Sequence, residues 1–153
     1  PSLRRRYSLR MKPTWPIGKS WENLRRNSPL RKFVRSNAKY GETMSKIYRS
    51  SRIVLNFIRK QNGDAHNMRT FEVPACGGFM LATRTKEQTE FFREGEEADF
   101  FSSPEELRTK IKYYLSNPDL RTAIAQRGLE RVENETYLQR MEKVTKVLES
   151  LRS

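Results

Sequence analysis

The feature that most constrains the fold is a continuous apolar run, RIVLNFI, at residues 52–58. It has the length of a β-strand, is rich in branched side chains and lacks the alternation of a strand with one solvated face. Such runs are typical of strands buried on both faces of a parallel sheet. Further strands are predicted at FMLAT, 79–83, and EADFF, 97–101. Strands alternating with helices predict an α/β fold, a Rossmann-like parallel sheet with flanking helices.

Local signals place helices around these strands. Apolar residues at helical spacing predict a short helix before residue 52, and a second helix runs from about 67 or 68 to 76. Gly77 and Gly78 are expected to end that second helix, because glycine accepts the positive φ of a C-terminal cap. A third, short helical stretch is KEQTEFFREG, between the second and third strands.

The C-terminal third is predicted to be helical. Ser103, Pro104 and Glu106 form the pattern of a capping box, and an apolar stripe follows on the same helix. Asn117 with Pro118 repeats the start signal. A last helix is expected from about Thr136, with one apolar side made of Leu138, Met141, Val144, Leu148 and Leu151.

The charge of the chain lies in one segment. The net charge is +13, yet residues 1–60 hold 17 Lys and Arg against two acidic residues, while residues 61–153 are slightly acidic. We therefore expect a basic N-terminal segment, 1–40, as an incomplete start of the domain, and a Rossmann-like domain, 41–153, that ends in C-terminal helices. The basic segment mixes Arg with Trp and Tyr, as nucleic-acid-binding arms do, but we favour the alternative of a solvated, partly disordered stretch whose partner surface is absent.

Composition excludes several classes of protein. Cys76 is the single cysteine, so no disulfide framework or Cys-based zinc site is built within this chain, and we expect a small buried hydrophobe there. No apolar run has the length of a membrane span, and the N-terminus lacks the apolar core of a signal peptide. These features predict a cytoplasmic protein. The chain begins with Pro1 rather than Met, which suggests a piece of something longer.

Polar chemistry gathers after the first strand. In an open parallel sheet, ligands bind beyond the carboxyl ends of the strands, where loops lead into helices, and residues 59–68 form such a loop. The helix start and Arg69 favour phosphate oxygens, and the Glu72 carboxylate suits a diol such as a ribose. Together they predict a site for a phosphorylated sugar or nucleotide. At this spacing, Arg69 and Glu72 equally fit an ordinary surface ion pair.

A family resemblance gives this site a more specific interpretation. The stretch MRTFEVPACGGFML, with YGETMSKIYRSSRIVLNF before it and FFREGEEADFFSSPEELRTKIKYYLSNPDLRTAIAQRGLERV and TYLQR after it, resembles the C-terminal part of group 1 type glycosyltransferases. The nearest branch resembles the spore-maturation, spore-coat glycosyltransferase-like proteins. The resemblance covers about residues 40–145. It implies the C-terminal half of a GT-B enzyme of the hexosyltransferase type, with a UDP- or GDP-sugar as donor substrate and no cofactor, and makes residues 41–153 its nucleotide-sugar (donor) binding domain.

The resemblance also implies roles for single residues. Glu72 matches the second acid of the family's E-x7-E motif, which binds the donor ribose. Asp64 occupies the first-acid position, where an Asp departs from the pattern by one methylene. The backbone from Asn67 to Arg69 is expected near the diphosphate, with Arg69 as its side-chain partner. Asn56 matches an Asn at the strand end that faces the cleft, although tying down the next loop is an equal alternative.

The remaining candidates are His66, Gly77 and Gly78. The glycines match the position after the helix and are assigned to packing and helix termination. His66, the only histidine, is expected to donate to phosphate or sugar at the cleft edge. Asp64 and His66 supply only two loop ligands, so we predict no metal site.

Three functions remain open on sequence alone. The first is the donor-binding portion of a glycosyltransferase that is inactive alone, because its N-terminal acceptor domain and the early part of the donor domain are missing from this chain. The second is a non-catalytic scaffold that keeps the fold. The third is a nucleic-acid-binding protein acting through residues 1–60. The sequence does not specify the sugar, the base, the acceptor, the stereochemical outcome, the oligomeric state or which residues are catalytic.

Overall fold

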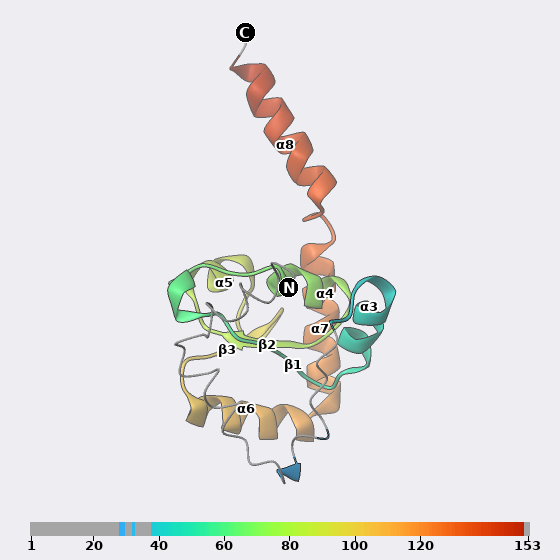
Figure 1. The fold of residues 1–153 in the computed structure, drawn as a ribbon, viewed down its shortest axis with the longest axis vertical. Coiled ribbons are helices and arrows are strands. Elements are labelled where there is room, and N and C mark those ends of the chain that lie inside the picture. Colours follow the sequence, from blue (N-terminus) through green and yellow to red (C-terminus); the bar gives the residue numbers. More distant parts are fainter. Residues whose placement is uncertain (1–27, 30–31, 33–37, 152–153) are drawn as a thin grey trace, which may run out of the picture. The chain divides into compact units, whose positions relative to one another are not determined.

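The computed structural model describes residues 28–29, 32 and 38–151 (Figure 1). The chain divides into two compact units, Pro1–Ala38 and Lys39–Ser153, and every helix and strand discussed below belongs to the second. Most of the basic segment predicted at 1–40 lies outside the described residues.

The described strands form one parallel sheet in chain order, which confirms the α/β prediction. β1 (Val54–Asn56) pairs with β2 (Met80–Thr83), which pairs with β3 (Asp99–Phe101). The crossovers contain α4 (Arg69–Ala75) and α5 (Lys86–Phe91), with a short 3-10 turn, η2 (Lys60–Asn62), before α4. β1 is shorter than the predicted run because the Ile58 N–H donates to the Thr83 side chain, 3.2 Å away, instead of extending the backbone ladder.

Helices cover both faces of the sheet, as Figure 1 shows. α3 (Gly41–Ser50), α4 and α5 lie on one face, and α6 (Pro104–Ser116) lies on the other. Successive side chains of a strand point to opposite faces, so the sheet builds two apolar clusters. One contains Tyr48, Val73, Met80, Ala82, Phe92, Ala98, Phe100 and Val132. The other contains Phe79, Leu81, Phe101, Tyr114 and Ile124.

α7 (Pro118–Val132) joins these two clusters, because Ile124 packs in one and Val132 in the other. Gly128 lies between them and is buried. A Cβ built at Gly128 would lie 2.4 Å from the Glu97 carbonyl oxygen. This helix therefore approaches the backbone before β3 so closely that only glycine fits.

The helix starts differ in detail from the predicted caps. Ser103 caps α6 by accepting from the Glu106 N–H at 3.1 Å. The capping box is not closed, however, because the Glu106 carboxylate accepts from the Ser102 N–H and from Arg84 instead of the cap residue. Asn117 does not cap α7 with its side chain, which donates to the Tyr113 carbonyl at 2.7 Å.

The last helix, α8 (Tyr137–Ser150), begins with the full capping box that the sequence only partly indicated. Thr136 accepts from the Gln139 N–H, and the Gln139 side chain accepts from the Thr136 N–H. No side chain of α8 is buried, and its apolar residues are all exposed. No described helix combines the length and the apolarity needed to cross a membrane.

The glycines after α4 occupy the places expected of them. Gly77 has φ +71°, the left-handed conformation of a helix end. A Cβ at Gly78 would lie 3.0 Å from the Tyr48 carbonyl oxygen, so the close packing of α3 on this turn requires a small residue. Cys76 is half-buried rather than fully buried, because it lies at the end of α4 beside a cavity.

Candidate functional site

A buried polar network lies at the carboxyl end of the sheet. Asn56, the last residue of β1, is fully buried and accepts from the Asn67 side chain at 2.8 Å. Its own amide nitrogen lies 3.5 Å from the Thr70 hydroxyl, which donates to Gln88 at 3.1 Å. Gln88, also fully buried, donates to the Thr83 carbonyl at 2.6 Å. The network thus ties the loop before α4 to the ends of β1 and β2 and to α5.

Buried amides need such partners because an unpaired polar group in the interior costs about 1–3 kcal/mol. Within the described part of the chain, Asn67 Oδ1 is the one buried side-chain oxygen or nitrogen without a hydrogen-bond partner. Asn67 also lines a cavity next to the network. The network therefore positions a residue that faces both the interior and this cavity.

That cavity, which we call the carboxyl-edge cavity, has a volume of about 350 Å³. It lies between the start of α4 and the turn that joins α7 to α8. Its walls combine aromatic rings, two carboxylates and two basic side chains: His66, Asn67, Met68, Phe71, Glu72, Glu135, Tyr137 and Arg140. A small ligand with polar groups and a flat apolar ring fits this chemistry.

His66 is held in one orientation at the edge of this cavity. Its Nδ1 lies 2.5 Å from Glu87 Oε2, and since a carboxylate only accepts, Nδ1 carries the hydrogen of this bond. The ring meets Phe71 and Phe91 edge-on, at centroid distances of 5.6 and 5.1 Å. The Glu87 N–H also donates to the Asp64 carbonyl, so α5 fixes the loop at two points.

Two residues of α8, Tyr137 and Arg140, also line the carboxyl-edge cavity. The Arg140 guanidinium lies over the Phe71 ring, 4.5 Å from its centroid, and pairs with Glu135 at 3.3 Å. Tyr137 is 80% exposed. A flat ligand group that stacks on Tyr137 would find aromatic carbon there and the Arg140 cation in the same cavity lining.

The structure brings together some of the sequence-predicted site residues and separates others. His66, Asn67 and Glu72 line the carboxyl-edge cavity, and Asn56 lies behind Asn67. In contrast, Asp64 and Arg69 are exposed and do not line it. Arg69 and Glu72 make no ion pair with each other or with any other described residue.

Sequence reasoning missed Thr70, Gln88, Tyr137 and Arg140. Thr70 lies inside the motif stretch, and its position two residues before Glu72 was the available signal. The others come from α5 and α8, and their proximity to the loop depends on how the helices pack. Gln88 has no local signal, whereas Tyr137 and Arg140 lie in TYLQR, a stretch that the family resemblance already includes.

A second charged cluster closes the outer edge of β3 and has a structural role. Lys110 donates to the Phe100 carbonyl at 2.6 Å and pairs with buried Asp99 at 2.9 Å, while the Phe100 N–H is taken by Asp99. Arg84 bridges Glu94 and Glu106. Hydrogen bonds from Arg84, and then from the Ser102 N–H, lower the pKa of Glu106 to about 2. The cluster satisfies the backbone of an edge strand with side chains, which prevents further strand pairing there.

Comparison with known proteins adds one finding. The sequence model of the glycosyl transferase-like family matches residues 5–146 of the 153. No curated protein and no solved structure matches the chain. Because the match spans nearly the whole sequence, including the sheet and the carboxyl-edge cavity, the chain belongs to the glycosyl transferase-like family.

Proposed function

We propose that this chain binds the nucleotide-sugar donor of a glycosyltransferase, and that the donor occupies the carboxyl-edge cavity. The observation that carries the proposal is that Glu72, His66 and Asn67 line one cavity beyond the carboxyl ends of β1 and β2. Membership of the glycosyl transferase-like family supports a role in glycosyl transfer. The finer assignments, a UDP- or GDP-sugar and the spore-maturation branch, rest on the resemblance of the motif around Glu72.

In this proposal each lining residue has a defined task. The Glu72 carboxylate accepts hydrogen bonds from the two ribose hydroxyls. His66 directs Nε2 to the ligand, since Nδ1 is engaged with Glu87. The neutral ring then accepts from a sugar hydroxyl, and the protonated ring donates to a phosphate oxygen. Tyr137, which is exposed, supplies aromatic surface for the base, and Arg140, which lies over Phe71, supplies a cation in the same lining.

The proposal separates donor binding from transfer. Transfer needs an acceptor and a group that stabilises the departing diphosphate. Arg69, the expected partner of the diphosphate, lies outside the cavity lining, whereas Arg140 lies within it, so the contact of Arg69 with the diphosphate stays a prediction. We place the acceptor site on a second domain of a GT-B arrangement, and we expect hexosyl transfer by this chain alone to be undetectable.

Isothermal titration with UDP and GDP tests the proposal. The wild-type chain should bind one of them saturably, and Glu72→Ala should weaken that binding by about tenfold or more, because a charge-assisted pair of hydrogen bonds is lost. Glu105→Ala, which removes an exposed carboxylate on α6, is the matched control and should bind like wild type. Failure of the wild type to bind either nucleotide, or equal binding by Glu72→Ala, would contradict a donor site here.

The charge of the N-terminal segment favours a second candidate function, nucleic-acid binding. Residues 1–60 carry 17 basic and two acidic side chains. Binding of this kind depends steeply on salt, because it releases counterions from the phosphate backbone. A filter-binding series with single-stranded RNA between about 50 and 200 mM salt tests this function, because RNA binding should weaken steeply as the salt rises. Glu72→Ala should leave RNA binding unchanged and should weaken only nucleotide binding in the cavity.

A further inference from the structure

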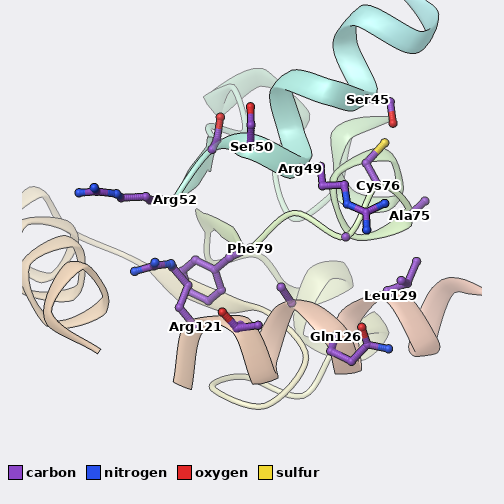
Figure 2. A pocket seen from close by; sticks show the side chains of 14 residues that line it. Ser45, Arg49, Ser50, Arg52, Ala75, Cys76, Phe79, Arg121, Gln126 and Leu129 are labelled. Carbon is purple, nitrogen blue, oxygen red and sulfur yellow. The ribbon is translucent and has the colours of Figure 1, made fainter. Parts of the chain in front are cut away.

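A larger cavity lies at the opposite, amino end of the strands. We call it the amino-edge cavity; its volume is about 510 Å³ (Figure 2). Its walls come from α3 and the residues that follow it, the end of α4, Phe79 just before β2, and α7 from Arg121 to Leu129. Because α3 leads into β1 and α4 leads into β2, this cavity and the carboxyl-edge cavity lie at opposite ends of the sheet. It is therefore separate from the proposed donor site.

The lining of the amino-edge cavity is one-sided in charge. Arg49, Arg52 and Arg121 line it, and no Asp or Glu does. Figure 2 shows Arg49 coming from α3 and Arg121 from α7, on opposite walls. Hydroxyl and amide groups complete the polar lining: Ser45, Ser50, Ser51, Thr122 and Gln126.

Most of this positive charge is not used within the described part of the chain. The side chains of Arg49 and Arg52 make no ion pair or hydrogen bond there, and Arg121 uses Nη1 to donate to the Tyr114 carbonyl at 2.5 Å. Other arginines of the same fold pair with glutamates, as Arg84 and Arg93 do. Like charges around one cavity repel each other, and a bound anion removes that cost.

The C-terminal carbonyls of the neighbouring helices are not hydrogen-bond partners of the Arg49 and Arg52 side chains. The C-terminal carbonyls of α3 and α4 would attract cations. On α3 the Ile47 carbonyl already accepts from the Ser51 N–H and hydroxyl, and on α4 the Pro74 carbonyl accepts from the Gly77 N–H. The guanidinium groups of Arg49 and Arg52 therefore remain available to a ligand.

We propose that the amino-edge cavity binds a small molecule that carries two or more phosphate groups. Guanidinium groups present planar pairs of N–H donors that match phosphate oxygens, and this cavity carries them on two walls, Arg49 from α3 and Arg121 from α7. Three positive charges require more than one phosphate for balance. The volume accommodates a ligand of nucleotide size.

The test is a titration with inorganic pyrophosphate at fixed ionic strength. Wild type should bind it saturably, and the double variant Arg49→Ala/Arg52→Ala should bind about tenfold more weakly or not at all, because charge-assisted hydrogen bonds are lost. These two side chains make no hydrogen bond or ion pair with the described residues, so the thermal unfolding of the double variant should stay close to that of wild type. The control Arg108→Ala/Lys112→Ala removes two exposed charges from α6 and should bind like wild type.

Cys76 provides a readout of position, because it is the single cysteine and lines this cavity. Pyrophosphate should slow its alkylation by iodoacetamide in wild type and in the α6 control, but not in the Arg49/Arg52 double variant. UDP and GDP carry two phosphates themselves, so the carboxyl-edge cavity is separated by mutation instead: Glu72→Ala should show the same protection of Cys76 by pyrophosphate as wild type.

Three results would overturn the proposal. The first is the absence of pyrophosphate binding by wild type. The second is equal weakening in both double variants, which would indicate a general charge effect. The third is binding of an acidic peptide in place of pyrophosphate, which would make this cavity a protein contact.

Discussion

At the scale of residues, a few buried side chains determine where the loop before α4 lies. Asn56 could be identified from the sequence because it ends an apolar strand, and the loop-tying alternative describes its contact with Asn67. Whether it also faces a ligand stays a prediction. Gln88 could not be identified, since it reads as one of several polar residues on a short helix. Its partner Thr70 is 18 positions away and meets it only after α5 packs.

Glu106 gives a pH-dependent prediction. Its pKa is lowered from 4.5 to about 2 by Arg84 and the Ser102 N–H, so it stabilises the fold fully above pH 4.5, and this contribution is lost as the pH falls towards 2. Glu106→Gln should lower the urea midpoint of unfolding at pH 7. In wild type this midpoint should fall as the pH is lowered from 4.5 to 2, and in Glu106→Gln it should fall less over the same range. Glu105→Gln, the exposed neighbour, should keep the wild-type decline. Equal slopes for Glu106→Gln and wild type would show that the cluster around Arg84 does not depend on this charge.

At the scale of elements, the helix starts were more predictable than the strand ends. A cap is a local device, so Ser103 and Thr136 are found where the sequence indicates. Strand ends depend on partners from elsewhere, which is why the run at 52–58 contributes only Val54–Asn56 to the sheet. The open capping box at Glu106 has the same cause, because Arg84 comes from the end of β2 and competes for the carboxylate.

Thr136→Ala tests what α8 contributes. The change removes the side-chain half of a capping box, which costs a helix about 1 kcal/mol. Since no side chain of α8 is buried, we expect the helical circular dichroism signal at 222 nm to decrease, while the urea midpoint of unfolding stays close to that of wild type. Thr145→Ala, in the middle of the same helix, should leave the helical signal nearly unchanged. A fall in the urea midpoint for Thr136→Ala would show that α8 packs on the sheet in solution.

At the scale of the whole molecule, α7 holds the two apolar clusters together, and Gly128 tests this role. Alanine normally favours a helix over glycine by about 1 kcal/mol. Here the added Cβ would lie 2.4 Å from the Glu97 carbonyl and would push α7 away from both clusters. Gly128→Ala should therefore destabilise the fold by about 1–3 kcal/mol in urea unfolding. Glu130→Ala, exposed on the same helix, should change stability by less than about 0.5 kcal/mol.

The fold class could be predicted from sequence patterns that lie within single segments. The two cavities could not be predicted in this way. Alternating strands and helices predict a parallel sheet, which the structure confirms. The carboxyl-edge cavity needs α8 beside α4, and the amino-edge cavity needs α7 opposite α3. Arg140 and Arg121 lie in stretches of the family resemblance, but nothing in the sequence shows which cavity each of them lines. Their neighbours are set by packing between segments far apart in the chain.

The position of His66 between two phenylalanine rings has a practical consequence for spectroscopy. The rings of Phe71 and Phe91 pack edge-on against the imidazole ring of His66. Their aromatic ring currents should shift the imidazole proton resonances away from the values of a free peptide. The chain has one histidine, so these resonances need no assignment and no isotope label. A one-dimensional proton spectrum recorded during a titration would then report directly when the carboxyl-edge cavity fills.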